Sequence, residues 1–262
     1  MFNAKSKELK QKILDIGYKT GKGHLGGTFS VLDILVSLYY SDTLTFDYSD
    51  LKSPLRDIVL VGKGHACLAT YCILADKGAI DWSLLDEFGV NGGKLGTQFD
   101  ISFDGAESNT GSLGHVVGIA AGYGLSFKLS KSNRRAYAII GDGECDEGSI
   151  WESMDFAVKN KLDNVTVIVD KNNLSVTSQT ENSDELVQKF IAFGAEVRVV
   201  DGHNYSELLE AWKFSSLKSD RPAVIIANTV KGNGVSFMEN NPKWHQSAMT
   251  ESEYEQAKGE LS

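Results

Sequence analysis

The sequence predicts an α/β fold in which a doubly wound, mainly parallel sheet carries helices on both faces. Short apolar runs rich in β-branched residues alternate along the chain with longer segments of helical pattern. The short runs are apolar at nearly every position, which is typical of strands that are covered on both sides. Alternating strands and helices favour a parallel sheet, because each helix can return the chain to the start of the next strand.

Five runs are predicted as strands and seven segments as helices. The strands are residues 58–61, 136–140, 165–169, 196–200 and 223–227. The helices are residues 7–18, 31–40, 66–77, 113–129, 150–159, 185–193 and 205–217. No repeat, low-complexity segment or flexible linker interrupts the pattern, so we expect a single domain over residues 1–262. After Asn240 we expect a loop followed by a short polar helix.

The charge balance argues against a nucleic-acid binder. The 262 residues include 26 Lys and Arg against 35 Asp and Glu, a formal net charge of −9. A protein that binds phosphates in nucleic acid usually carries a basic patch, and the pair Arg134 and Arg135 is too isolated to make one. Hydrophobic residues make up 42% and charged residues 23% of the chain, so intrinsic disorder is not expected either.

Two further features concern the cellular compartment. No stretch approaches about 18 consecutive apolar residues, and the polar start of the chain lacks the apolar core of a signal peptide. The cysteines, Cys67, Cys72 and Cys145, are odd in number and include no C-x-x-C pair. We therefore expect a cytoplasmic protein whose cysteines are packing residues in a reducing compartment.

The strongest motif is GDGECDEG, residues 141–148, which begins where a predicted strand ends and stops where a helix begins. Its glycines allow backbone N–H groups to approach a ligand closely, and a helix N-terminus favours an anion. Asp142 would repel a bare phosphate unless a cation lay between the two. Mg²⁺ meets that requirement, because it binds carboxylate and phosphate oxygens together.

A second oxygen ligand is expected from the neighbouring strand. The strand at residues 165–169 leads to Asn172, which lies 30 residues after Asp142. A strand, a helix and a strand fill that interval, so both loops should meet at the same edge of the sheet. The EF-hand, P-loop and dinucleotide patterns all lack required residues here. A solvated turn is the plainer interpretation of the acidic loop alone, and Asn172 counts against it.

With these motifs in place, the chain resembles the transketolase family. GDG-E-x-x-EG followed by D-x-N after the next strand is the thiamine diphosphate signature, and other segments along the chain are similar as well. These segments are GKGHLGG, GKGHACLATYCIL, NTGSLGH, VDGHN and KGNGVSFMENNPKWH. The resemblance covers nearly the whole chain and implies the diphosphate-binding part of the fold, as in the small subunit of split transketolases.

The resemblance implies which residues hold the cofactor and its metal. Asp142 and Asn172 would bind Mg²⁺, or Ca²⁺ or Mn²⁺, through their side chains, and Leu174 would bind it through its carbonyl oxygen. Thiamine diphosphate would be held by residues from several loops, namely His65, Gly111, Ser112, Leu113, Gly143, Glu144, Asn172 and His245.

It also implies catalytic and substrate-binding residues. His24, His65 and His245 would line the reactive face of the cofactor, where they bind the diphosphate, shuttle protons or orient sugar hydroxyls. Imidazole suits this work because it titrates near neutral pH and can both donate and accept. Glu147 would meet the partner chain near the catalytic centre. The two other histidines, His115 and His203, are expected to be ordinary hydrogen-bonded polar residues.

One position departs from the family pattern. Gln98 stands where family members usually carry a histidine that contacts the donor end of the sugar. Glutamine can hydrogen-bond a hydroxyl or carbonyl group, but it cannot transfer a proton. An altered donor preference, or a related ketol or acyl transferase that uses a 2-oxo acid, therefore stays open.

The expected reaction cleaves a ketose next to its carbonyl and passes a two-carbon ketol unit to an aldose. In this family the glutamate that activates the cofactor belongs to a pyrimidine-binding domain, which we do not expect within residues 1–262. We therefore expect its partner to be a separately encoded pyrimidine-binding subunit, in a heterotetramer. A non-catalytic scaffold subunit is the alternative of a different class, and the intact metal ligands and histidines disfavour it.

Overall fold

The computed structural model describes residues 1–174 and 183–262. In these residues the strands are β1 (Ile58–Val61), β2 (Ala136–Gly141), β3 (Val165–Lys171), β4 (Glu196–Asp201) and β5 (Ala223–Asn228). The α-helices are α1 (Phe2–Thr20), α2 (Leu25–Tyr39), α3 (Cys67–Asp76), α4 (Val116–Leu129), α5 (Gly148–Lys159), α6 (Ser183–Ala192), α7 (Tyr205–Ser215) and α8 (Glu251–Glu260). Short 3₁₀ helices are η1 (Gly64–Ala66), η2 (Trp82–Glu87), η3 (Gly143–Asp146) and η4 (Pro242–His245).

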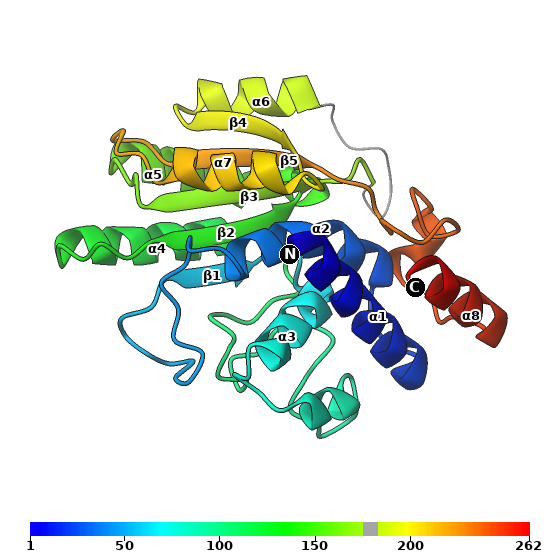
Figure 1. Ribbon diagram of the computed structural model, residues 1–262. Helices are drawn as coiled ribbons and strands as arrows, with labels where there is room; N and C mark the ends of the chain where they lie inside the picture. The colour runs from blue at the N-terminus through cyan, green and yellow to red at the C-terminus, as the bar shows by residue number, and fades with distance from the viewer. Residues whose placement is uncertain (175–182) are drawn as a thin grey trace.

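The strands form one parallel sheet in the order β1-β2-β3-β5-β4. Figure 1 shows them side by side, with their carboxyl ends toward the right-hand side of the view. The chain steps from β1 to β3, continues to the edge at β4 and turns back to β5. Because the direction reverses, α7 covers the face opposite to α4, α5 and α6. The doubly wound parallel sheet predicted from the sequence is confirmed.

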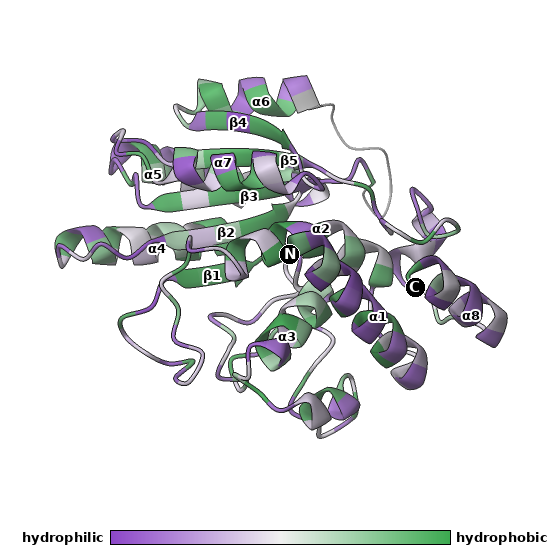
Figure 2. Ribbon diagram, in the orientation of Figure 1, coloured by the Kyte–Doolittle hydropathy of each residue, from purple (hydrophilic) through white to green (hydrophobic). Residues whose placement is uncertain are grey.

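Each face of the sheet has its own hydrophobic core. One core joins α1, α2, α3 and α7 to strand residues such as Tyr137 and Ile225. The other joins α4, α5 and α6 to the alternate strand residues, such as Ala138 and Val224. Figure 2 shows the strands as hydrophobic and α8 as largely hydrophilic. Burial on both faces explains the unbroken apolar runs of the strands.

The largest difference from the sequence prediction is at α2, which begins at Leu25 instead of residue 31. The glycines in GKGHLGG favour a loop locally, since glycine costs about 1 kcal/mol in a helix relative to alanine. Tight packing outweighs that cost. A Cβ on Gly26 would lie 2.7 Å from the carbonyl oxygen of Trp244, and one on Gly27 would lie 3.1 Å from Nε2 of His65. The approach at Gly26 is to backbone, so a side chain there would force α2 and η4 apart, whereas at Gly27 the imidazole of His65 would have to shift slightly.

The remaining elements agree closely with the prediction. After Asn240 the chain forms the short helix η4, which was not predicted, and then a loop and the polar helix α8, which were. The thiols of Cys67, Cys72 and Cys145 are all buried, which agrees with their expected packing role. In the described part of the chain, no helix is both long enough and apolar enough to cross a membrane.

Candidate functional site

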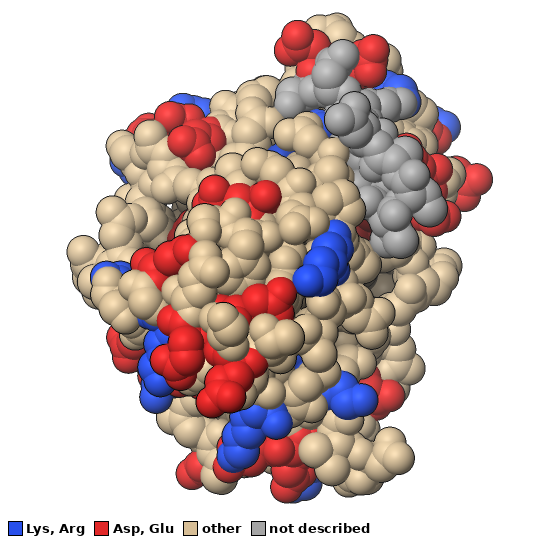
Figure 3. Space-filling model, turned by 90° about the vertical axis from the view of Figure 1, so that its right-hand side faces the viewer, with Lys and Arg blue, Asp and Glu red and all other residues tan. Residues whose placement is uncertain are grey.

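A cavity of about 260 Å³ opens at the carboxyl edge of the sheet. The segments that follow β1, β2, β3 and β5 form it, together with α2 and η4. Its lining residues are Gly27, Lys63, His65, Leu113, Gly141, Asp142, Gly143, Glu144, Asp146, Glu147, Asn172, Leu174, Lys231 and His245. Figure 3 views this side of the molecule and shows acidic side chains gathered near the middle of the face.

Hydrogen bonds tie the loop after β2 to the loop after β3. Asp142 Oδ1 accepts from the backbone N–H of Gly143 at 3.0 Å, and Oδ2 accepts from that of Asn173 at 2.7 Å. Asn172 Oδ1 accepts from the backbone N–H of Leu174 at 3.2 Å. The structure therefore brings together the three residues that the sequence analysis proposed as metal ligands, and all three line one cavity.

These residues fit a hard cation that is shared with a diphosphate. Asp142, Asn172 and the carbonyl of Leu174 offer only oxygen atoms, which is the donor type that Mg²⁺ prefers. Among the described residues, no three His, Cys, Asp or Glu side chains gather as a metal site of their own. Phosphate oxygens would have to complete the coordination, and the cavity lies where they could do so.

Glu144 acts on the backbone around the cavity. Its carboxylate accepts from the N–H groups of Gly114 at 2.9 Å and Gly141 at 3.3 Å. Burial raises the pKa of Glu144 to about 7, although those two hydrogen bonds lower it. The side chain thus joins the turn before α4 to the end of β2.

Only part of the turn before α4 lines the cavity. Leu113 lines it, whereas Gly111 and Ser112 are exposed and do not line it. Gly111 has a φ of 124°, a conformation that side chains other than glycine rarely adopt. Glu147 is exposed at the start of α5 and lines the cavity as well.

The three predicted catalytic histidines form a cluster. The ring centroids of His24 and His65 are 5.1 Å apart, those of His24 and His245 are 5.3 Å apart, and those of His65 and His245 are 5.1 Å apart. His65 and His245 line the cavity, while His24 caps the start of α2 beside them. Nδ1 of His24 is buried without a hydrogen-bond partner among the described residues.

The imidazoles of this cluster are neutral at physiological pH. Burial and then the charge of Lys63 lower the pKa of His65 to about 2. Burial and then the charge of Lys231 lower the pKa of His245 to about 4, and the same two causes lower that of His24. A neutral imidazole can accept a proton or hydrogen bond from a ligand hydroxyl group.

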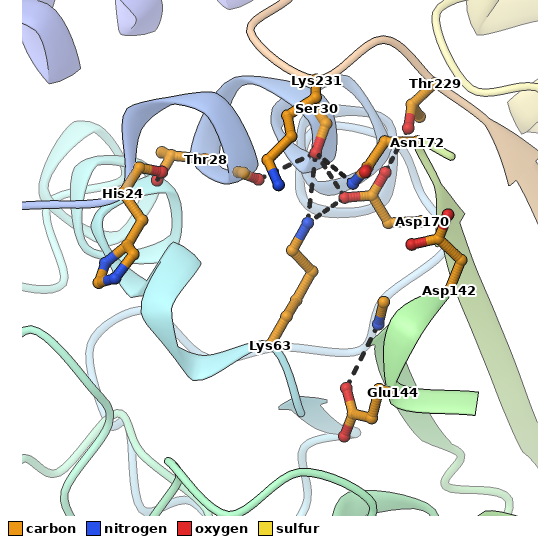
Figure 4. A network of polar contacts seen from close by, with 12 residues as sticks. His24, Thr28, Ser30, Lys63, Asp142, Glu144, Asp170, Asn172, Thr229 and Lys231 are labelled. Atoms are coloured by element: carbon orange, nitrogen blue, oxygen red, sulfur yellow. Dashed lines mark hydrogen bonds and ion pairs between the residues drawn. The ribbon is translucent and has the colours of Figure 1, made fainter. Parts of the chain in front are cut away.

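A buried polar network beneath the cavity was not anticipated from the sequence. Lys63, on the segment after β1, forms an ion pair with Asp170 of β3, and both side chains are almost fully buried. Ser30 of α2 donates to Asp170 at 2.6 Å, and Thr229 donates to the other carboxylate oxygen. Figure 4 shows these side chains converging beside Asn172 and Asp142. The network joins α2, β3 and the segments after β1 and β5 at one edge of the sheet.

The sequence of residues 5–262 matches the family described as "Transketolase, thiamine diphosphate binding domain". The chain belongs to the transketolase family. It is 38% identical to one of the subunits of the apulose-4-phosphate transketolase of Actinobacillus succinogenes, over 98% of this chain and 94% of that one. It is 35% identical to the 6-deoxy-6-sulfo-D-fructose transketolase subunit SqwG of Clostridium sp., over 96% of this chain and 92% of that one.

Solved transketolases share the fold. The crystal structure of transketolase from Campylobacter jejuni has a TM-score of 0.89 and 29% identity, and the match covers 98% of this chain. This chain spans 42% of that transketolase and 36% of human transketolase, to which it is 34% identical. The thiamine diphosphate-binding fold expected from the motifs is therefore confirmed, and the resemblance extends along the chain as predicted.

Besides Lys63, the sequence analysis did not predict a second lysine at the site of this transketolase domain. Lys231, after β5, lies 3.3 Å from the carbonyl oxygen of Leu174 and 3.1 Å from Nδ1 of His245. Burial, followed by the charge of Lys63, lowers its pKa to about 8. Lys63 and Lys231 could have been predicted, because each follows a predicted strand, as Asp142 and Asn172 do. In an open parallel sheet, ligands bind at the carboxyl ends of the strands.

Three further residues named from the sequence lie outside the cavity. Gln98 accepts from Thr110 Oγ1 at 3.3 Å, close to Gly64 and hence to the segment that carries His65. His203 contacts Asp33 at 2.6 Å through Nδ1, and its Nε2 accepts from the N–H of Val230 at 2.8 Å. His115 is exposed and lies 3.1 Å from the hydroxyl of Ser112. The two histidines are thus hydrogen-bonded polar residues, as expected.

Proposed function

We propose that this chain is the diphosphate-binding subunit of a two-component transketolase that depends on thiamine diphosphate and Mg²⁺. A separately encoded pyrimidine-binding subunit would complete two active sites in a heterotetramer. The reaction is transfer of a two-carbon ketol unit from a ketose to an aldose, in the cytoplasm. The observation that carries this proposal is the match over nearly the full length of relatives that are themselves named as subunits.

The metal and cofactor would be held by the residues already described. Asp142, Asn172 and the carbonyl of Leu174 would bind Mg²⁺ together with diphosphate oxygens. Gly143, Leu113 and Glu144 would shape the diphosphate loop through the backbone. Bound thiamine diphosphate would supply the electron sink that cleavage next to a carbonyl requires. Glu147 would contact the partner, since it is exposed and lines the cavity.

The histidine cluster would handle the sugar. Neutral imidazoles at His24, His65 and His245 can accept hydrogen bonds from hydroxyl groups and hold a proton in transit. Nδ1 of His24, which has no partner among the described residues, is available for such a contact. Burial first, and then the charges of the lysines beside the cluster, lower the pKa values of His65 and His245, so these imidazoles stay uncharged and can accept.

A 2-oxo acid donor is the second candidate, and Gln98 is the observation that favours it. Its carboxamide lies near the segment of His65, where it could hydrogen-bond a ligand but could not move a proton. Supplying the assembled enzyme with a 2-oxo acid or a ketose separates the two functions. Release of carbon dioxide before transfer would favour the 2-oxo acid, and its absence with efficient ketose turnover would favour transketolase.

Replacing Asp142 tests the proposed site. In the complex with its partner, Asp142→Ala should lower Mg²⁺-dependent ketol transfer by at least about a hundredfold, because the cation loses its carboxylate. Binding of thiamine diphosphate at saturating Mg²⁺ should weaken in parallel, as measured by calorimetry. Asp146→Ala is the matched control, since this exposed carboxylate lines the same cavity and should tolerate the change. Unchanged activity of Asp142→Ala would point to a scaffolding role.

A further inference from the structure

The motif VDGHN, residues 200–204, has no part in the proposed function. It spans the end of β4, the turn after it and the residue that caps α7. β4 is the edge strand that pairs with β5, so this turn lies beside the segment that follows β5. The turn does not line the cofactor cavity. It nevertheless lies at the same edge of the sheet, where it can act on residues that do.

The turn packs tightly on the segment after β5. The backbone N–H of Gly202 donates to the carbonyl oxygen of Asn228 at 2.7 Å. A Cβ on Gly202 would lie 2.4 Å from Cγ2 of Thr229 and 3.1 Å from that same carbonyl oxygen, so a larger residue would have to displace Thr229. Thr229 itself donates to Asp170 in the buried network beneath the cavity. The turn and the segment after β5 are therefore held together.

His203 extends this contact toward the cavity. Its Nδ1 lies 2.6 Å from Asp33 of α2, and its Nε2 lies 2.8 Å from the backbone nitrogen of Val230. A backbone N–H can only donate, so Nε2 accepts, and Nδ1 carries the ring proton and donates it to the carboxylate. Both ring nitrogens are thus used, and the imidazole bridges α2 and the residue before Lys231.

Asp33 holds this imidazole in place. Its carboxylate also accepts from the hydroxyl groups of Tyr205, at 2.7 Å, and Ser6, and Lys10 lies 3.9 Å away. Burial raises the pKa of Asp33, but the hydrogen bond from His203 and then the charge of Lys10 lower it overall, so the carboxylate is ionised and accepts from Nδ1. Residues of α1, α2 and α7 therefore fix the orientation of the ring.

The residue after Val230 reaches the candidate metal site. The buried side chain of Lys231 lines the cavity and donates to the carbonyl oxygen of Leu174 at 3.3 Å. That oxygen is the proposed third protein ligand of the cation. A shift of the backbone at Val230 would therefore move the ammonium group that contacts this ligand.

We propose that His203 is a positioning residue for the metal and cofactor site. Through the backbone of Val230 it holds Lys231, which in turn holds the carbonyl oxygen of Leu174. This inference rests on the proposed function, because it takes that oxygen as a metal ligand. Replacing residues that orient metal ligands from outside typically weakens metal binding by about 10–100-fold.

Two substitutions of His203 separate its two hydrogen bonds. An asparagine amide reaches about as far as Nδ1, so His203→Asn keeps the bond to Asp33 and loses the bond to Val230. A glutamine amide reaches about as far as Nε2, so His203→Gln can still accept from Val230 and loses the bond to Asp33. Tyr205→Phe is the matched control, because it removes one hydrogen bond to the same carboxylate and leaves His203 paired with Val230.

Two measurements follow each variant in the complex with its partner. Without cofactor, amide hydrogen exchange at Val230 should be about fivefold faster in His203→Asn, because the N–H loses its acceptor, and close to the wild type in the other two variants. The dissociation constant of Mg²⁺ at saturating thiamine diphosphate, measured by calorimetry, should rise about tenfold in His203→Asn and less than about threefold in the others.

The proposal is overturned if His203→Asn changes neither exchange at Val230 nor Mg²⁺ affinity, or changes only one of them. It is also overturned if His203→Gln or Tyr205→Phe weakens Mg²⁺ binding as much as His203→Asn does. A wild type that binds no Mg²⁺ with thiamine diphosphate overturns both this proposal and the proposed function. A wild type that binds both but transfers no ketol unit contradicts the proposed function alone, and the binding data still decide the role of His203.

Discussion

At the scale of single residues, the charges beneath the cavity are paired before any ligand binds. Lys63 and Asp170 are buried together, and Ser30 and Thr229 complete the hydrogen bonds of the carboxylate. A buried ion pair of this kind need not add net stability, but removing one partner leaves the other charge uncompensated. The pair therefore holds β1, β3 and α2 in the arrangement that the cavity requires.

Lys63→Met should destabilise the protein by about 3–5 kcal/mol, because Asp170 loses its counter-charge in a buried site. Urea unfolding of the chain measures this free energy. Lys161→Met breaks the exposed pair with Asp220, formed at 3.1 Å, and should cost less than about 1 kcal/mol. Equal losses of unfolding free energy in the two variants would contradict a larger contribution from the buried pair.

The histidine cluster predicts a pH dependence of stability. An unfolded histidine binds a proton near pH 6.5, whereas folded His65 and His245 stay neutral until about pH 2 and 4. Unfolding therefore takes up protons below pH 6.5, and the free energy of unfolding falls as the pH is lowered from 6.5 toward 4.

His245→Asn should make that decline shallower, by up to about one bound proton. Urea unfolding at a series of pH values measures the slope. Replacing the exposed His115 with Asn is the control and should leave the slope unchanged. A His245→Asn profile as steep as that of the wild type would show that this imidazole does not stay neutral in the folded protein.

Residues that follow predicted strands could be assigned to the site from the sequence, and those joined only by tertiary packing could not. Asp142 and Asn172 follow neighbouring strands, so the parallel topology brings them together. Ser30 and Asp170 are separated by 140 residues, and nothing local indicates their contact. That Gly111 and Ser112 do not line the cavity depends likewise on the tertiary path of the turn.

At the scale of elements, α2 depends on glycines that local propensity disfavours. Gly26 lies against the carbonyl oxygen of Trp244, which belongs to the same short helix, η4, as His245. The close approach of α2 to η4 therefore places His24 and His245 together. The family resemblance predicted that these histidines meet, but the packing of α2 on η4 could not be predicted, because helix propensity alone counts each glycine as a break.

Gly26→Ala should destabilise the chain by about 1–3 kcal/mol, since the new methyl group overlaps the backbone of Trp244. Gly122→Ala, in α4, is the matched change: no atom lies within 4 Å of the new Cβ, and helix propensity should stabilise by about 1 kcal/mol. The urea concentration at the midpoint of unfolding, measured for each variant and the wild type, distinguishes the two changes. Opposite signs are expected, and a stabilised Gly26→Ala variant would show that α2 and η4 are not tightly packed.

At the scale of the whole molecule, the parallel order of five strands brings four loops to one edge, where the cavity forms. The parallel sheet and the meeting of its loops at one edge could be predicted from the alternation of strands and helices in the sequence. The face of that edge also carries the exposed Glu147, the residue expected to meet a second chain. Three relatives that match over nearly their full length are named as subunits, which supports a partner-dependent enzyme.

The most direct measurement of the central claim is ketol transfer from a ketose to an aldose by this chain, by its pyrimidine-binding partner and by the two together, with thiamine diphosphate and Mg²⁺. We expect turnover only when both chains are present, and its loss when either the cofactor or the metal is withheld. Transfer by this chain alone, or by the mixture without thiamine diphosphate, would contradict the account.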